Sequence, residues 1–194
     1  MGVKIDQDLT IILPLWDRSM FTKRWMKYAN DIGIPYKIII ADGGKNTEIE
    51  RHLLDKRNYP FLNYDYFKYP YDKTYYEYYM KINDALSKAI TPFVVMADDD
   101  DFFILNGLQK AIDFLQNNPD YSSARGKMGQ FDVIVDKKYG VNIGVYGEIN
   151  YHVNDNCHSL ENNTPLERLK AISFLRLQPC FYDVQRKENI VEYF

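Results

Sequence analysis

Short apolar runs alternate along the first 120 residues with longer segments whose apolar residues recur every three or four positions. The short runs predict buried β-strands, because they are too short for free-standing helices and too apolar for surface loops. They cover residues 9–13, 36–41, 61–66 and 93–96. The longer segments are typical of amphipathic helices. We expect these helices over residues 19–31, 47–57, 73–89 and 106–116. The alternation predicts an α/β fold, a mostly parallel sheet with helices on both faces.

Single residues set the expected ends of several elements. Pro14 stops the first strand, and Ser19 is placed to cap the helix that follows. Gly33 ends that helix, because glycine adopts the conformation of a C-terminal cap without strain. In the helix over residues 73–89, residues at helical spacing predict one buried face. Its members are Tyr75, Tyr79, Ile82, Leu86 and Ala89.

The pattern changes after residue 121, where the chain becomes rich in short strands and turns. The expected strands cover residues 121–125, 131–135, 142–146 and 180–184. The polar stretch 148–163 predicts an irregular loop, and Thr164-Pro165 begins a helix. Because no low-complexity linker interrupts the chain, we expect one domain over residues 1–194, with halves at about 9–120 and about 121–194. The apolar stop at 190–194 fits a truncated chain or a minimal domain.

Four consecutive carboxylates, Asp98–Asp101, follow the fourth predicted strand directly. Adjacent carboxylates repel one another, which disfavours full ionisation unless a cation sits among them. Open α/β sheets bind ligands just outside the carboxyl ends of their strands. We therefore expect a site for a hard cation, Mg²⁺ or Mn²⁺, that serves a phosphate-bearing substrate; the alternative is a solvated acidic turn. A further acid, Asp42, ends the second strand and precedes Gly43-Gly44, which permit a tight turn.

Bulk composition excludes several classes of function. The formal net charge of −3 leaves no general basic face for nucleic acid. No apolar run approaches the roughly 20 residues of a membrane span, and the N-terminus lacks the apolar core of a signal peptide. Two cysteines, Cys157 and Cys180, give no disulfide framework. We expect a cytoplasmic protein, with peripheral attachment to a membrane left open. The 17 tyrosines favour half-buried surface, with a sugar-binding surface as the alternative.

The motifs, in their order and spacing, resemble the family 2 glycosyltransferases with the GT-A fold. The first strand and its loop run Ile11–Arg18, matching the family's apolar-Pro-x-Tyr-Asn-Arg pattern in part. The second strand ends in an Asp followed by small residues, Ile38–Gly44. The third helix carries an Asn, in Ile82–Ala85, and the acidic run Met96–Asp101 matches the DxD hallmark. The resemblance covers about residues 9 to 116 and implies a GT-A fold.

The resemblance implies a metal-dependent glycosyltransferase of the hexosyltransferase type. It would move a sugar from a nucleotide-diphosphate sugar, UDP-linked by expectation, to an acceptor hydroxyl with inversion, as in polysaccharide biosynthesis. The acceptor, whether glycan, lipid-linked or protein, is not specified. Nucleotide-sugar contacts would fall to Pro14, Trp16, Asp17, Arg18, Asp42, Asn83, Asp98 and Asp99. The Mn²⁺ or Mg²⁺ ligands would be Asp100 and Asp98, with Asp101 and His158 as further candidates.

An inverting transfer also needs a base that removes the proton from the acceptor hydroxyl. In the family this base is an acid downstream of the acidic run. No downstream acid here stands in a recognisable motif, so the catalytic base is not assigned. The weak candidates are Asp132, Glu148, Asp155 and Asp183, with Glu161 and Glu167 behind them. His152, Cys157 and His158 do not supply four ligands at the spacing of a zinc site.

Three other functions fit parts of the sequence. A catalytically weak nucleotide-sugar-binding or interaction module of the same fold would explain the missing base motif. A phosphohydrolase of the HAD type also uses two aspartates after a strand, but normally the first strand. A sugar nucleotidyltransferase would need a glycine-rich loop after the first strand, where Pro14–Arg18 contains no glycine.

Overall fold

The computed structural model describes residues 6–134, 148–154, 159–175 and 181–190. The chain forms two compact units, one made of residues 1–125 with 180–194 and the other of residues 126–179. The second half expected from the sequence is therefore not one continuous stretch, because the C-terminal residues return to the first unit. The single-domain assignment stays a prediction.

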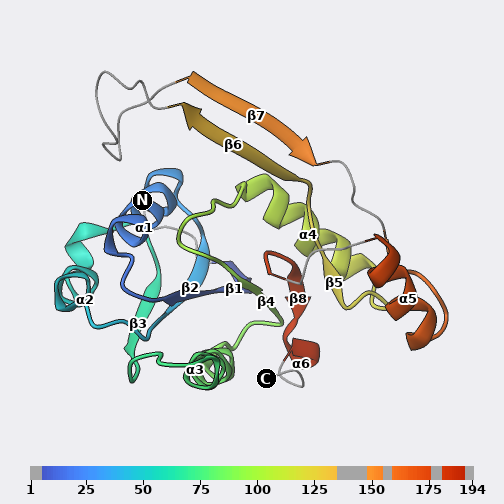
Figure 1. Ribbon diagram of the computed structural model, residues 1–194, viewed down its shortest axis with the longest axis horizontal. Coiled ribbons are helices and arrows are strands. Elements are labelled where there is room, and N and C mark those ends of the chain that lie inside the picture. Colours follow the sequence, from blue (N-terminus) through green and yellow to red (C-terminus); the bar gives the residue numbers. More distant parts are fainter. Residues whose placement is uncertain (1–5, 135–147, 155–158, 176–180, 191–194) are drawn as a thin grey trace. The chain divides into compact units, whose positions relative to one another are not determined.

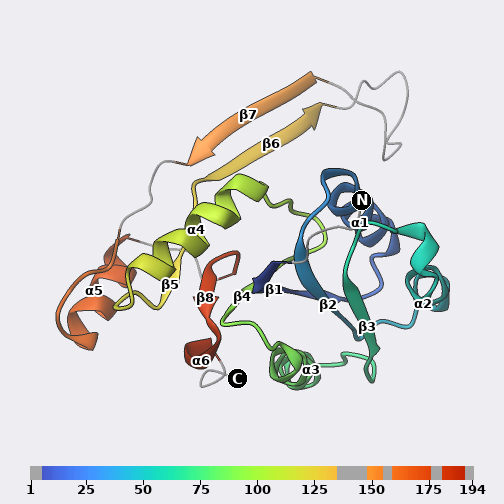
Figure 2. The same ribbon diagram turned by 180° about the vertical axis from the view of Figure 1, so that it is seen from behind.

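A six-stranded sheet is the centre of the first unit (Figures 1 and 2). The strand order is β3-β2-β1-β4-β8-β5. The four parallel strands are β1 (Asp6–Leu15), β2 (Tyr36–Asp42), β3 (Tyr64–Lys68) and β4 (Phe93–Met96). A short strand, β8 (Val184–Arg186), pairs antiparallel with β4 and with β5 (Ser123–Ala124). The predicted α/β class with a mostly parallel sheet is confirmed.

Helices cover both faces of this sheet (Figure 1). On one face lie α1 (Ser19–Ile32), α2 (Thr47–Leu54) and α4 (Leu105–Asn117), and on the other α3 (Tyr75–Lys88) and α6 (Lys187–Ile190). A short 3₁₀-helix (Lys56–Asn58) precedes β3. Successive strand residues point to opposite faces. Ile11 and Leu13 of β1 accordingly join the core under α1, whereas Ile12 joins the core under α3.

The described residues of the second unit form two antiparallel strands and a helix. The strands are β6 (Met128–Ile134) and β7 (Glu148–Asn154), and the helix is α5 (Pro165–Leu175). The irregular loop predicted from residue 148 is wrong over β7, because apolar residues at 149, 151 and 153 alternate with polar ones as in a strand. The predicted strand over 142–146 lies outside the described residues. The predicted start of α5 at Pro165 is confirmed.

Three further predictions of detail were wrong. Strand β1 continues through Pro14, which pairs in register with Ala41 of β2. Because β4 pairs with β1 only as far as Ile12, the missing N–H of Pro14 removes no bond to β4. Strand β3 begins at residue 64 and β8 at residue 184, each several residues later than predicted. Within the described residues, no helix has the length and apolar character of a membrane span.

The buried face of α3 also differs from the prediction. Tyr75 and Tyr79 are 80% and 50% exposed, whereas Ile82 and Leu86 are buried as expected. A charged side chain takes part in the buried face, because Lys81 is only 2% exposed. The first turn of α3 therefore presents aromatic rings to solvent, and the buried ammonium group of Lys81 follows about one and a half turns later.

Candidate functional site

The carboxyl ends of β1 and β4 meet at the point where the strand order reverses. From β1 the chain crosses to β2 through α1 on one face, and from β3 it crosses to β4 through α3 on the other (Figure 2). The loops that leave neighbouring strands then diverge, and α/β sheets bind ligands in the crevice between such loops. The loop after β1 carries Trp16, Asp17 and Arg18, and the loop after β4 carries the acidic run. The topology thus confirms that both lie at this edge.

Three of the four acids of the run form a cluster. One carboxylate oxygen from each of Asp98, Asp99 and Asp100 lies within 4.8 Å of the others. The side chain of Asp99 is 1% exposed, whereas those of Asp98 and Asp100 are 39% and 41% exposed. Thr22 of α1 donates its hydroxyl hydrogen bond to Asp99 Oδ2 at 2.8 Å. Asp99 therefore points into the protein, and its two neighbours present oxygens toward solvent.

Arg18 brings a positive charge to all three carboxylates. Its Nη2 forms ion pairs with Asp98 and, at 2.5 Å, with Asp99 Oδ1. Its Nη1 donates to Asp100 Oδ2 at 2.9 Å. Burial lowers the pKa of the guanidinium, but the attraction of Asp99, Asp98 and Asp100 outweighs it and raises that pKa. The loop after β1 is thereby joined to the loop after β4 across the crevice.

Burial raises the pKa of both the Asp98 and the Asp99 carboxyls above the usual aspartate value. Arg18 opposes the shift at both sites, and the hydroxyl of Thr22 opposes it at Asp99. Three crowded carboxylates favour a cation among them, and in this structure the guanidinium of Arg18 takes that place.

The donor set fits a divalent hard cation. Mg²⁺ and Mn²⁺ take oxygen ligands, and Mg²⁺ is usually held by one or two carboxylates together with substrate phosphates. Asp98 and Asp100 have partly exposed carboxylates, each paired with Arg18, and their roles as metal ligands stay predictions. The carboxylate of Asp101 instead accepts a hydrogen bond from the Tyr182 hydroxyl at 2.6 Å. His158 lies outside the described residues, and the ligand roles of both stay predictions.

Asp42, at the end of β2, is buried and bonded within the protein. Its Oδ1 accepts from the Gly44 amide at 2.7 Å, and its Oδ2 accepts from the Tyr66 hydroxyl at 2.5 Å and from Lys68 Nζ at 2.9 Å. A Cβ at Gly44 would lie 2.8 Å from the backbone nitrogen of Asp17. The glycine therefore allows the loops after β1 and β2 to approach each other closely.

Asp17 also connects the loops after β1 and β2. It adopts a left-handed conformation with φ of 51°, and its Oδ1 accepts from the amides of Lys45 at 2.6 Å and Asn46 at 3.0 Å. Next to it, Trp16 is 52% exposed, with its ring 6.2 Å from that of Tyr71. Trp16 is thus an exposed aromatic residue in the loop after β1, and its contact with a nucleotide stays a prediction.

Two of the residues predicted to contact the nucleotide sugar do not lie beside the acidic cluster in the described contacts. Pro14 is buried inside β1 and presents no side chain at the crevice. Asn83 is half-buried on α3, beside the buried Ile82. The described contacts tie neither of them to the acidic cluster, and their nucleotide contacts stay predictions.

A buried ion pair beneath the loops was missed by the sequence analysis. Lys81 forms an ion pair with Asp72 and donates to the Leu15 carbonyl at 3.1 Å. Asp72 in turn bonds through its amide to the Gly43 carbonyl at 3.0 Å, and the Gly43 amide bonds to Leu15 at 3.1 Å. These bonds join α3 to the ends of β1 and β2. One feature of the sequence could have indicated this ion pair. Lys81 lies one helical turn before Ala85, among the apolar residues of the buried face of α3.

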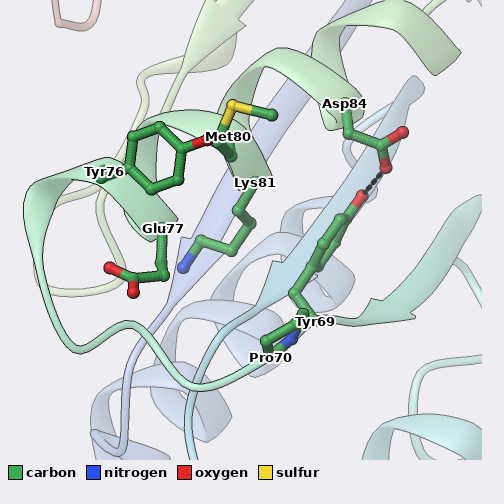
Figure 3. A pocket seen from close by; sticks show the side chains of 7 residues that line it. All are labelled: Tyr69, Pro70, Tyr76, Glu77, Met80, Lys81 and Asp84. Atoms are coloured by element: carbon green, nitrogen blue, oxygen red, sulfur yellow. Dashed lines mark hydrogen bonds between the residues drawn. The ribbon is translucent and has the colours of Figure 1, made fainter.

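A pocket of about 260 Å³ adjoins this ion pair on the α3 side (Figure 3). It is lined by Tyr69, Pro70, Tyr76, Glu77, Met80, Lys81 and Asp84. Figure 3 shows Tyr69 reaching Asp84, to which its hydroxyl donates at 2.5 Å. The amide of Tyr69 also bonds to the Asp42 carbonyl at 2.8 Å. The pocket therefore lies at the same sheet edge as the crevice.

The described side chains give no strong candidate for a catalytic base. The Asp183 carboxylate faces Arg125 at 3.4 Å, and burial raises its pKa, an arrangement that suits an anchor between β5 and β8. Glu167 accepts from the amide and hydroxyl of Thr164 and so caps α5. Glu161 is exposed in the second unit. The side chains of Asp132, Glu148 and Asp155 lie outside the described part of the chain.

No family model and no curated protein matches the chain. Among solved structures, it is similar to TarS of S. aureus. The structure of TarS residues 1–349 has a TM-score of 0.48 and 16% identity over 58% of this chain and 33% of that one. The complex of TarS 1–349 with UDP-GlcNAc has a TM-score of 0.43 and 17% identity, over 58% of this chain and 32% of that one. The complex with UDP has a TM-score of 0.44 and 16% identity, over 58% of this chain and 33% of that one. The chain thus spans about a third of these structures.

Proposed function

We propose that this protein is a glycosyltransferase of the GT-A fold, similar to family 2, that takes a sugar from a nucleoside-diphosphate sugar, with UDP as the expected nucleotide. The observation that carries the proposal is the meeting of Arg18 with Asp98, Asp99 and Asp100 at the point where the strand order reverses. This is the place at which α/β sheets bind nucleotides.

Each group at the crevice has a proposed role toward the diphosphate. Asp98 and Asp100 would hold Mg²⁺ or Mn²⁺ through their exposed oxygens. The bound cation would stabilise the negative charge that develops on the leaving diphosphate. Arg18 supplies a planar fork of donors, a geometry that matches phosphate oxygens.

The nucleoside would lie toward β2, on the other side of Arg18. Trp16 offers the exposed ring on which a nucleobase can stack. Asp42 is satisfied by Gly44, Tyr66 and Lys68, so we propose that it shapes the nucleoside pocket by holding these groups in place. This differs from the direct contact that the resemblance implies.

The transfer would proceed with inversion and needs a base for the acceptor hydroxyl. Because Asp183 pairs with Arg125, we place the base among Asp132, Glu148 and Asp155.

The test is a screen of nucleotide sugars with Mn²⁺ that measures the released nucleoside diphosphate. We expect release from at least one UDP-sugar, loss of it in Asp100→Ala, and retention in Asp113→Ala, an exposed acid on α4 that serves as the matched control. Binding of a UDP-sugar without any turnover would favour the non-catalytic module. Failure to bind any nucleotide would contradict the proposal.

A further inference from the structure

The guanidinium of Arg18 occupies the position among the three carboxylates that a cation would take. Nη2 contacts Asp98 and Asp99, and Nη1 contacts Asp100, so all the acids of the cluster share one side chain. The Arg18 side chain is 38% exposed, which leaves it an open side toward solvent. It can therefore leave the carboxylates without disturbing the core.

Arg18 and a divalent cation compete for the same oxygens. The guanidinium already uses the two exposed carboxylates that would hold the metal, through charge-assisted hydrogen bonds. A cation that entered beside it would be repelled by its charge at contact distance. Binding of the metal alone thus requires that Arg18 exchange its three carboxylate partners for water.

We propose that Arg18 is a built-in counter-ion that makes the divalent-cation site dependent on the nucleotide. A bound nucleoside diphosphate offers the guanidinium phosphate oxygens, to which it can move while Asp98 and Asp100 turn to the metal. Metal and nucleotide then strengthen each other's binding, and by linkage the two effects are equal. The inference rests on the proposed function and states how the same site is regulated.

Arg24 of α1 provides a matched control, because its guanidinium, like that of Arg18, packs on the ring of Phe21. Its guanidinium packs against the rings of Phe21 and Phe102, at 4.9 and 5.3 Å from their centres. It reaches the acidic run only through the backbone carbonyl of Asp100, at 3.4 Å. Loss of Arg24 therefore removes the same charge from the same neighbourhood and leaves the carboxylates paired with Arg18.

The experiment measures Mn²⁺ binding without nucleotide, by the electron paramagnetic resonance signal of free Mn²⁺. We expect Arg18→Gln to bind Mn²⁺ at least about fivefold more tightly than wild type, the lower end of typical coupling between sites. Arg24→Gln should stay within about twofold, since an exposed charge is screened by salt. Arg18→Lys keeps the charge without the fork and should lie between wild type and Arg18→Gln. Thermal unfolding without metal shows that each variant is folded.

The same titration with UDP separates the inference from the proposed function. We expect UDP to tighten Mn²⁺ binding in wild type and to do so at least about fivefold less in Arg18→Gln. If UDP and Mn²⁺ bind wild type but independently, or if the Arg18 variants bind Mn²⁺ no more tightly than Arg24→Gln, the inference is overturned and the proposed function stands. If wild type binds Mn²⁺ neither with nor without UDP, both the inference and the metal site of the proposed function are contradicted.

Discussion

Arg18 Nη2 lies 2.5 Å from Asp99 Oδ1, although the two residues are 81 positions apart in the chain. Arg18 immediately precedes the first residue of α1, and Asp99 follows β4. Thr22, one turn into α1, holds the other oxygen of Asp99. The ion pair and this hydrogen bond make the first turn of α1 and the acidic run one connected piece of structure.

Replacement of Thr22 by valine tests this connection. The change removes the hydroxyl that donates to the buried Asp99 at 2.8 Å while it keeps the shape of the side chain. Hydrogen bonds to charged groups contribute about 1.5–3 kcal/mol, so we expect a loss of this size in the free energy of unfolding. Urea denaturation measures it, and Thr22→Ser, which keeps the hydroxyl, should lose clearly less. Equal stability of wild type and Thr22→Val would show that the bond contributes nothing.

Lys81→Met should destabilise the protein strongly. It leaves Asp72 as an unpaired carboxylate that is 8% exposed, and breaking a buried ion pair costs about 3–5 kcal/mol. The double variant Lys81→Met with Asp72→Asn removes the unpaired charge and should recover part of this loss. Chemical denaturation of the two single variants and the double variant measures the free energies of unfolding for this double-mutant cycle. A double variant that is less stable than the sum of its single changes would refute the pairing.

Gly43→Ala and Gly107→Ala should change stability in opposite directions. A Cβ at Gly43 would overlap the Asp72 carboxylate, and we expect a cost of about 1–3 kcal/mol, typical of overpacking. At Gly107, within α4, the nearest atom to an added Cβ is Ile104 Cβ at 4.0 Å. There alanine should stabilise the helix by up to about 1 kcal/mol. Thermal unfolding of the two variants distinguishes them, and a stable Gly43→Ala would argue against the close approach of Gly43 to Asp72.

Trp16→Ala should weaken UDP binding with little effect on stability. Stacking of a base on an aromatic ring contributes about 1–3 kcal/mol, which corresponds to roughly five- to 150-fold in affinity. Because the Trp16 side chain is 52% exposed, its loss removes little core packing. Phe61→Ala, which removes a ring that is 56% exposed, serves as the control. Calorimetric titration with UDP gives both affinities, and equal values in the two variants would exclude Trp16 as the stacking surface.

The elements that the sequence predicted best are those whose signal is local. The apolar runs of strands β1, β2 and β4 are buried, so they identify these strands without knowledge of their partners. The position of the acidic run at a strand end follows from the same local signal. Helix α1 ends at Gly33 as predicted, because glycine alone tolerates φ of 63° without cost there.

The parts that sequence analysis missed depend on distant partners. Strand β8 has three residues and no periodicity to detect, and its place beside β4 is decided by pairing with residues about 90 positions earlier. Lys81 was predicted at no site, because its burial makes sense only with Asp72 and the Leu15 carbonyl beside it. For the same reason, Arg18 was expected near a nucleotide, but its contact with all three acids could not be foreseen.

The most direct test of the central claim is calorimetric titration of UDP into the protein with Mn²⁺ and, separately, with EDTA. We expect UDP to bind wild type and Asp113→Ala when Mn²⁺ is present, and to bind at least about tenfold more weakly with EDTA or in Asp100→Ala, because we propose that Asp100 holds the cation that would neutralise the diphosphate. Equal affinity for UDP under all of these conditions, or no binding of UDP to wild type, would contradict the account.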